Sequence, residues 1–355
     1  MVTIGVDAHK QQHMAVALDD AGRELGRWQG PNNADGWSGM LVWAEGLGEE
    51  RVWGIEGAWN YGRGLSQHLV GAGERVYEVN PRWTAQERRK ARKPDKSDPL
   101  DARAVAQYVL RKDAALPVVV AEDETVVLDL LVTEREGATA EATKLRNQIH
   151  QLLLQLDPEY KSHLPDLKSN AGLDALLAYT APEGSSVVRQ QRAASVRRLA
   201  ERLKLATQQA EELAKQISSL AGERFSPLTR LTGVQLLTAG ALAGILGPCT
   251  DRFATEAQFA AYAGVAPLEA SSAGKVRHRL NRGGNRRLNS ILYRIAVTQS
   301  RSSPEAKGYI QRRISEGKTA REALRALKRY IARAIWRLWR ECYVGGSAVT
   351  ETLAA

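Results

Sequence analysis

The chain has 355 residues, of which 43% are hydrophobic, and carries a formal net charge of +10 with a pI of about 9.6. These values exclude a globally disordered chain, predict two or three domains, and favour a polyanionic partner, nucleic acid before an anionic membrane. No apolar run approaches the roughly 20 residues of a spanning helix, and the first residues lack a signal-peptide pattern. Only Cys249 and Cys342 are present, which predicts no disulfide framework and is typical of a reducing cytoplasm.

The first 80 residues predict an α/β domain. Three strands form an antiparallel meander around the turn Asp20-Ala21-Gly22, and helices then alternate with strands until Asn80-Pro81. This element order is typical of a ribonuclease-H-like or RuvC-like α/β fold, although other mixed α/β folds share parts of it. The predicted elements are strands 2–8, 12–19 and 23–28, helix 34–47, strand 51–56, helix 59–70 and strand 75–79.

The central part of the chain is predicted to be helical. A basic stretch at 82–96 precedes helices at 99–111 and 122–156, and a connecting segment with prolines and glycines follows at 157–185. Apolar residues from Val196 to Leu220 then recur with a heptad period. Two such helices predict a coiled-coil segment, which either folds as a hairpin on its own core or pairs with another chain.

The C-terminal part is also predicted to be mainly helical. A polar, basic loop at 264–284 interrupts helices that are expected at 228–246, 256–262, 285–300 and 319–339. The last helix has one apolar face and one basic face, the latter carrying Arg325, Lys328, Arg329, Arg333, Arg337 and Arg340. We therefore expect domains at 1–120, 121–225 and 226–345, and a tail at 346–355.

Four carboxylates stand at the ends of predicted elements. Asp7 ends the first strand, Glu56 ends the fourth, and Asp98 and Asp101 lie three residues apart at the start of a helix, so both can face the same way. Carboxylates that converge repel one another unless cations lie between them, and paired Mg²⁺ ions activate phosphodiester cleavage. The set of four therefore favours a metal site.

Each of these residues also has a simpler interpretation. Asp98-Pro99-Leu100-Asp101 has the pattern of an ordinary helix start, with an N-cap acid and proline at the first helical position. Glu56 before Gly57 fits a polar strand end, and the segment ending at Asp7 also resembles a phosphate loop of sugar kinases. The joint placement of the four makes the metal site the stronger hypothesis.

The basic loop is a candidate nucleic-acid contact. No carboxylate occurs between Glu269 and Glu305, whereas eight cationic residues do, and glycines let the backbone approach a bulky ligand. Ser271-Ser272 lies at the edge of the loop, where ordinary turn serines are the simpler interpretation. The cations are Lys275, Arg277, Arg279, Arg282, Arg286, Arg287, Arg294 and Arg301.

Five motifs occur in an order that resembles a known family. They are Ile4-Gly5-Val6-Asp7-Ala8-His9-Lys10, Gly54-Ile55-Glu56-Gly57, Lys96-Ser97-Asp98-Pro99-Leu100-Asp101-Ala102-Arg103, Phe259-Ala260-Ala261-Tyr262-Ala263-Gly264-Val265-Ala266-Pro267 and Arg282-Gly283-Gly284-Asn285. Across nearly its whole length the chain resembles the DEDD transposases of insertion-sequence family 110, which are bridge-RNA-guided serine recombinases.

The resemblance implies roles for particular residues. It implies a RuvC-like domain in which Asp7, Glu56, Asp98 and Asp101 bind Mg²⁺, with Mn²⁺ as the alternative. It also implies a C-terminal serine that attacks DNA and forms a covalent phosphoserine. The family places this serine after a proline and before a glycine, and the spacing from Pro267 favours Ser272 over Ser271.

The resemblance further implies partners. Donor and target DNA would pair with a non-coding bridge RNA, while the protein would contact backbone and shape. We expect these contacts at Arg88, Arg89, Lys93, Lys275, Arg277, Arg279, Arg282, Arg286 and Arg287. Homo-oligomers, namely dimers and tetramers, would bring the serine of one subunit to the metal site of another, and the heptad seam is a candidate pairing surface.

Three alternatives remain open on the sequence. A Holliday-junction resolvase would use the four carboxylates and water without a serine. A catalytically dead nucleic-acid-binding scaffold would use the basic surface alone. A sugar-kinase-like ATPase is the weakest, because a second phosphate loop and an adenosine-binding glycine pair are not recognisable.

Overall fold

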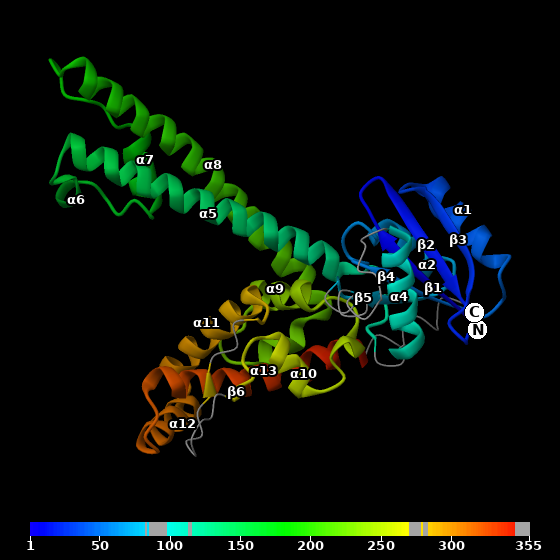
Figure 1. Ribbon diagram of the computed structural model, residues 1–355. Helices are drawn as coiled ribbons and strands as arrows, with labels where there is room; N and C mark the ends of the chain where they lie inside the picture. Colours follow the sequence, from blue (N-terminus) through cyan, green and yellow to red (C-terminus); the bar gives the residue numbers. More distant parts are fainter. Residues whose placement is uncertain (82–83, 85–97, 113–115, 270–277, 280–282, 345–355) are drawn as a thin grey trace. The chain divides into compact units, whose positions relative to one another are not determined.

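The computed structural model describes residues 1–81, 84, 98–112, 116–269, 278–279 and 283–344 (Figure 1). The chain groups into two compact units. Unit one comprises residues 1–123 and 247–258, and unit two comprises residues 124–246 and 259–355. Among the described helices, none is both long enough and apolar enough to cross a membrane.

Unit one contains the five predicted strands in one mixed sheet. The strand order is β3-β2-β1-β4-β5, with antiparallel pairing from β3 to β1 and parallel pairing from β1 to β5. The meander followed by parallel strands is the topology that the sequence predicts. The strands are β1 (Val2–Ala8), β2 (Gln12–Leu18), β3 (Glu24–Pro31), β4 (Arg51–Glu56) and β5 (Arg75–Val79).

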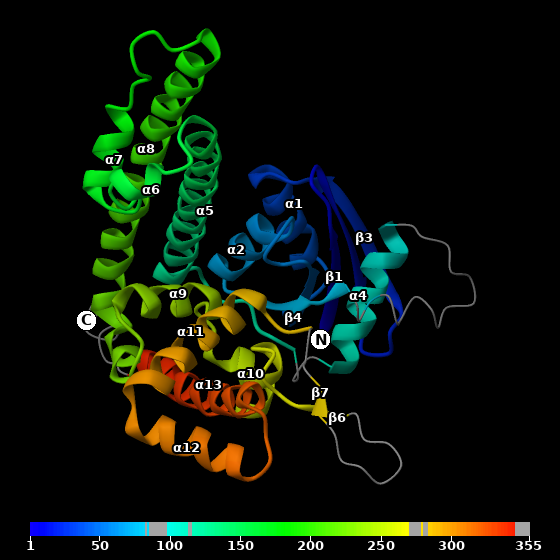
Figure 2. The same cartoon turned by 90° about the vertical axis from the view of Figure 1, so that its left-hand side faces the viewer.

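Helices cover both faces of this sheet (Figure 2). Ile4 and Val6 point to one face, where α1 (Ala34–Glu45) and α2 (Arg63–Gly71) complete a buried core with Trp53. The alternate residues of β1 point to the other face, which α4 (Asp98–Lys112) covers. Because both faces are covered, β1 is buried along its whole length.

Two glycines allow α4 to lie directly on the sheet. Gly5 of β1 and Gly54 of β4 are register partners, so they lie side by side beneath the helix. A Cβ atom at Gly5 would lie 2.2 Å from the backbone nitrogen of Ala106, and one at Gly54 would lie 2.3 Å from Cγ2 of Val109. At Gly5 the clash is with the backbone of α4 itself, so no side chain fits there without displacing the helix, whereas at Gly54 the clash is with valine side chains. Arg103 of α4 also donates a 2.7 Å hydrogen bond to Glu24 of β3.

One helix starts later than the sequence predicts. The expected helix 59–70 begins at Arg63, because residues 57–62 form turns in which the Asn60 amide donates to the carbonyl of Gly57. Gly57 has a φ of 69°, a left-handed conformation that favours glycine. The chain therefore turns immediately after Glu56 instead of entering a helix.

Unit two contains a long helical hairpin. Helices α5 (Glu124–Leu156) and α8 (Val187–Arg224) lie side by side (Figure 1) and share a core. They run antiparallel, because Glu141 pairs with Arg202 while Glu124 pairs with Arg224. The buried members of the heptad seam, among them Val196 and Leu203, pack against α5 of the same chain. Of the two predicted arrangements, the chain therefore adopts the hairpin, and the heptad seam of α8 is covered by α5 of the same chain.

The connecting segment between these helices is partly helical, contrary to expectation. It contains α6 (Tyr160–His163) and α7 (Asn170–Leu177). Ser169 caps α7 by accepting a hydrogen bond from the Gly172 amide, and Leu176 is buried. These helices are short and lie among prolines and glycines, so their periodicity is too brief to recognise in the sequence.

The remaining helices follow the prediction with three differences. The expected helix 228–246 is divided, since Gly233 adopts a φ of 89°. A separate helix, α12, occupies residues that were not predicted to be helical. Lys328 is buried rather than exposed on the basic face of α13. The elements are η2 (Ser226–Arg230), α9 (Leu236–Leu246), η3 (Thr250–Phe253), α10 (Glu256–Tyr262), β6 (Leu268–Glu269), β7 (His278–Arg279), α11 (Arg286–Ser302), α12 (Pro304–Ser315) and α13 (Ala320–Val344).

The close approach of α4 predicts a strong effect of a single methyl group. Gly5→Ala should lower the free energy of unfolding by about 1–3 kcal/mol, because the new Cβ overlaps the helix backbone. Urea unfolding followed by circular dichroism measures this change. Gly71→Ala is the matched control, since a Cβ there meets nothing within 4 Å. Equal unfolding midpoints for the two variants would contradict the proposed packing.

Candidate active site

Asp7 and Glu56 are neighbours at the edge of the sheet. They are Cα register partners at the carboxyl ends of the parallel strands β1 and β4. Register partners on adjacent strands lie about 5 Å apart and point to the same face. That face also carries Gly5 and Gly54 and is the face covered by α4. The two carboxylates predicted from distant parts of the sequence are therefore brought together by strand pairing.

Both carboxylates have defined polar contacts. The Oδ2 atom of Asp7 lies 3.1 Å from Nε2 of His9, and the Asp7 residue is only 8% exposed. The Oε2 atom of Glu56 accepts a 2.9 Å hydrogen bond from the hydroxyl of Thr84, which is buried. These contacts restrict the rotation of both side chains and so fix where their oxygens lie.

The start of α4 lies over the same part of the sheet. The carbonyl oxygen of Ala102 would be 2.3 Å from a Cβ at Gly5, two residues before Asp7. Asp101, immediately before Ala102, is 4% exposed. Asp98 is the first residue of α4, one helical turn earlier, but its side chain is outside the described residues. The backbone thus places both helical acids near the face that carries Asp7 and Glu56.

The chemistry of this donor set suits a divalent cation. Adjacent carboxylates repel each other, more strongly where one of them is buried as Asp7 is, and a cation between them offsets that repulsion. Oxygen donors are the ligands that Mg²⁺ prefers. Among the side chains that the structure describes, no group of three His, Cys, Asp or Glu is close enough to hold a metal ion. Asp101 is one of these side chains, so in this structure it does not complete a group of three with Asp7 and Glu56, contrary to the expected convergence of the four acids. The pair requires at least one further ligand, for which Asp98 has the appropriate position in the chain.

The predicted serine loop has an ordered base. Strands β6 and β7 pair at Leu268 and Arg279, and a Cβ at Gly284 would lie 2.3 Å from the backbone nitrogen of Gly264. Asn289 donates to the carbonyls of residues 263 and 264 and thereby ties α11 to this turn. The conformation of Gly264, with a φ of 67°, explains one of the glycines in the sequence motifs. The candidate serines Ser271 and Ser272 lie outside the described residues.

The predicted nucleic-acid contacts fall into two groups. Those whose placement lies outside the described residues are Arg88, Arg89, Lys93, Lys275, Arg277 and Arg282. Arg279 belongs to β7, although its side chain is not described. Arg286 is exposed at the first residue of α11. Arg287 instead forms ion pairs with Asp129 at 2.8 Å and with Glu136 at 3.2 Å, so its charge is balanced within unit two.

Two residues at the site were missed by the sequence analysis. His9 follows Asp7 by two positions, and the motif Asp-Ala-His is a signal that would have identified it. Thr84 stands in the basic stretch after β5, where nothing in the sequence indicates a contact with Glu56. Both residues act on the carboxylates through hydrogen bonds.

Comparison with known proteins identifies the family. A model of DEDD transposases of the IS110 group matches residues 4–158, and a model described as "Transposase IS116/IS110/IS902 family" matches residues 226–311. The chain belongs to the IS110 family of transposases. The two matches contain the carboxylate positions and the serine loop, respectively. As a transposase, the protein is an enzyme that cleaves and rejoins DNA strands.

Relatives of this IS110-family transposase include two proteins of bacterial insertion elements. The IS110 43.6 kDa protein of Streptomyces coelicolor is 27% identical over 288 residues, covering 69% of this chain and 71% of the relative. The IS900 42 kDa protein of Mycobacterium paratuberculosis is 22% identical, with 99% of both chains covered. Among solved structures, RuvC of T. thermophilus in complex with a Holliday junction substrate matches 34% of this chain and 99% of its own, with 14% identity and a TM-score of 0.27.

The hydrogen bond to Glu56 generates a prediction for the IS110-family transposase. Thr84→Val keeps the shape of the side chain but removes its hydroxyl donor, so Glu56 loses one of the contacts that orient it. We expect DNA cleavage to fall by about 10- to 100-fold, as is typical when an outer partner of a metal ligand is removed. Cleavage of a labelled donor DNA measures the effect. Thr84→Ser retains the donor and should retain activity; equal loss in both variants would contradict the role of the hydroxyl.

Proposed function

We propose that this chain is an RNA-guided transposase that cuts and rejoins DNA through a covalent phosphoserine at Ser272. Its metal site would consist of Asp7, Glu56, Asp98 and Asp101, with Mg²⁺ as the cation and Mn²⁺ as the alternative. A non-coding bridge RNA would select the donor and target DNA by base pairing.

The observation that carries the proposal is the register pair at the sheet edge. Asp7 and Glu56 lie on neighbouring parallel strands, and the helix over the same face begins with Asp98 and continues through Asp101. A histidine nitrogen contacts Asp7 and a threonine hydroxyl donates to Glu56, and these contacts hold carboxylate oxygens from two strands at one sheet edge. This arrangement favours a cation-binding function.

A cation bound by these carboxylates would polarise the scissile phosphate and offset its negative charge. The protein would supply the positions of the oxygens. His9 and Thr84 orient Asp7 and Glu56, and α4 carries Asp98 and Asp101. None of these residues needs to bond covalently to the DNA.

The serine performs the covalent step in this proposal. The Ser272 oxygen forms a bond to phosphorus while the bond from phosphorus to one deoxyribose oxygen breaks. The serine hydroxyl gives up its proton and the departing oxygen takes up one proton, so the cut strand ends in a free hydroxyl and the step has no net loss or gain of protons. Rejoining is the reverse reaction with a hydroxyl from another strand, so no external energy source or oxidant is required.

Assembly would complete the site. We propose dimers and tetramers in which the serine of one subunit reaches the carboxylates of another. Because α5 fills most of the heptad seam of α8, subunits would meet through other surfaces. Exposed apolar residues on the outside of the hairpin, such as Leu130, Leu154 and Leu205, are candidates for that contact.

The phosphoserine predicts a protein–DNA adduct. Wild-type protein with its co-expressed RNA should form an adduct with donor DNA that survives denaturing electrophoresis and maps to Ser272 by mass spectrometry. Ser272→Ala should abolish it, whereas the neighbouring variant Ser271→Ala should retain it. An adduct that disappears only in Ser271→Ala would move the nucleophile by one residue. Continued cleavage by Ser272→Ala without any adduct would instead indicate a resolvase that uses water.

The carboxylates predict a loss of cleavage without a loss of folding. Asp7→Asn and Glu56→Gln each remove one negative charge from a repelling pair, so stability should be unchanged or increased. Cleavage of donor DNA should fall by at least about 100-fold, because the metal loses a charged ligand. Asp35→Asn, on α1 and away from this face, is the matched control. Unchanged DNA processing in Asp7→Asn would favour a scaffold with an inactive acidic site.

A further inference from the structure

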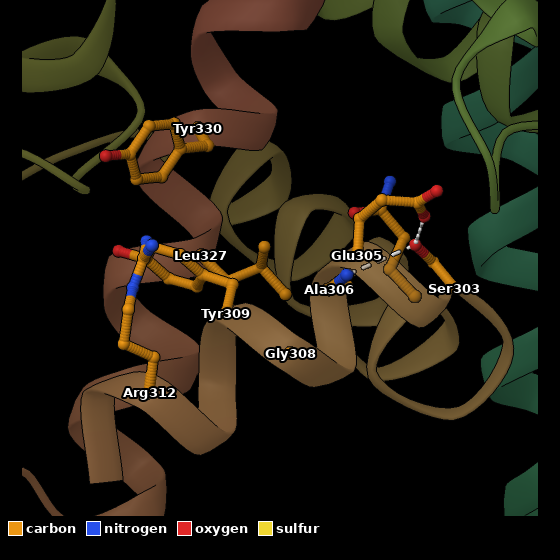
Figure 3. Close-up of a pocket in the computed structure, with 9 residues that line it drawn as sticks. Ser303, Glu305, Ala306, Gly308, Tyr309, Arg312, Leu327 and Tyr330 are labelled. Carbon is orange, nitrogen blue, oxygen red and sulfur yellow. Dashed lines mark hydrogen bonds between the residues drawn. The ribbon is translucent and has the colours of Figure 1, made fainter. Parts of the chain in front are cut away.

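A groove in unit two combines aromatic and cationic side chains. It lies between α12 and α13, beside the end of α11, and has a volume of about 530 Å³ (Figure 3). Volumes of this size are typical of sites for small organic groups. Tyr309 and Tyr330 form one end of the groove, and Ser303 and Glu305 form the other, with Gly308 between them.

The tyrosines provide a surface for stacking. Their ring centres are 5.1 Å apart at an interplanar angle of 72°, so the edge of one ring meets the face of the other. Tyr330 is 48% exposed, whereas Tyr309 is held by a 3.1 Å hydrogen bond from Nε of Arg313 to its hydroxyl. A fixed ring next to an exposed ring is the kind of platform on which an unpaired base stacks.

The helices around the groove are strongly cationic. Residues 304–344 contain eleven Lys or Arg and four Glu, a net charge of +7 within a chain whose net charge is +10. Guanidinium groups lie next to both rings: Arg312 is 5.4 Å from the centre of Tyr309, and Arg333 is 5.7 Å from that of Tyr330. Arginine beside an aromatic ring suits a base and its phosphate together.

A single carboxylate distinguishes the other end of the groove. The Ser303 hydroxyl donates a 2.7 Å hydrogen bond to Oε2 of Glu305 and lowers the pKa of that carboxyl group, which therefore remains an ionised acceptor at neutral pH. A carboxylate repels phosphate but accepts a hydrogen bond from a hydroxyl. The ribose 2′-hydroxyl is the donor that RNA has and DNA lacks.

From these contacts we infer that the groove between α12 and α13 binds an unpaired nucleotide of single-stranded RNA. The base stacks on Tyr330 against Tyr309, the phosphates lie along Arg312 and Arg333, and the 2′-hydroxyl donates to Glu305. This inference rests on the RNA partner of the proposed function and assigns that partner a site apart from the carboxylates.

The test measures RNA binding by the full-length protein in the absence of DNA. The probe is a labelled 12-nucleotide single-stranded RNA of mixed sequence that contains 4-thiouridine for photocrosslinking. Anisotropy gives the affinity, and mass spectrometry locates the crosslinked peptides. Strand exchange is not involved, so failure here is distinguishable from failure of the phosphoserine mechanism, which the adduct at Ser272 tests separately.

Two variants address the groove in different ways. Tyr330→Ala removes the exposed ring, and Gly308→Leu fills the groove from its middle, where a Cβ meets open space. The second change leaves every proposed contact residue in place and replaces a glycine within a helix, so folding should be preserved. Each should weaken RNA binding by about tenfold, the effect of losing one stacked base. Tyr330→Phe should retain binding. Tyr293→Ala, an exposed tyrosine of α11 outside the groove, is the control and should bind normally.

The crosslinks should map to α12 and α13 in the wild type and disappear in Gly308→Leu. Unchanged affinity in Gly308→Leu, with crosslinks elsewhere, would overturn the inference. Equal affinity for DNA of the same sequence, with the same loss in Tyr330→Ala, would overturn the assignment to RNA. Competition by poly-L-glutamate as effective as that by unlabelled RNA would show that the groove accepts acidic polypeptide and would also overturn it.

Discussion

The absence of two side chains determines how the site of unit one is built. Gly5 and Gly54 are adjacent in the sheet, and α4 occupies the space that their Cβ atoms would need. A helix that packs on ordinary side chains is held several ångströms further away. Here the helix backbone at Ala102, next to Asp101, lies against Gly5, two residues before Asp7. The distance from helix to sheet, rather than any single hydrogen bond, sets the geometry on which the carboxylate site depends.

At the sheet edge that carries Asp7 and Glu56, the repulsion between two carboxylates is opposed by the packing around them. Strand pairing brings Asp7 and Glu56 together, which is electrostatically unfavourable because little water reaches Asp7. The surrounding packing is correspondingly strong, since β1 is buried throughout and Arg103 fixes α4 to Glu24 of β3. Apolar burial on both sheet faces supplies the stability that the acidic pair reduces. A rigid support of this kind would suit the metal-assisted phosphoryl transfer that we propose, because its oxygens must stay fixed during the reaction.

The strands and long helices were predictable because their patterns are strong. Buried β4 and β5 appear at the expected residues, and the heptads of α8 end where glycine and proline interrupt them. The carboxylates were identifiable by their positions at strand ends. The roles of Gly5 and Gly54 were not, because a glycine in a strand does not reveal which neighbour needs its space. Likewise, the contact of Thr84 with Glu56 and the burial of Lys328 depend on tertiary packing that no local pattern encodes.

The hairpin of α5 and α8 has a consequence for how the protein spans distance. Helices of 33 and 38 residues extend about 50 and 57 Å at 1.5 Å per residue. Because each helix completes the core of the other, the rod keeps its length without a second molecule to brace it. The hairpin can therefore hold α6 and α7 at a fixed distance from the residues where α5 begins and α8 ends. Evolution can lengthen such a rod by whole heptads in both helices while leaving the catalytic machinery untouched.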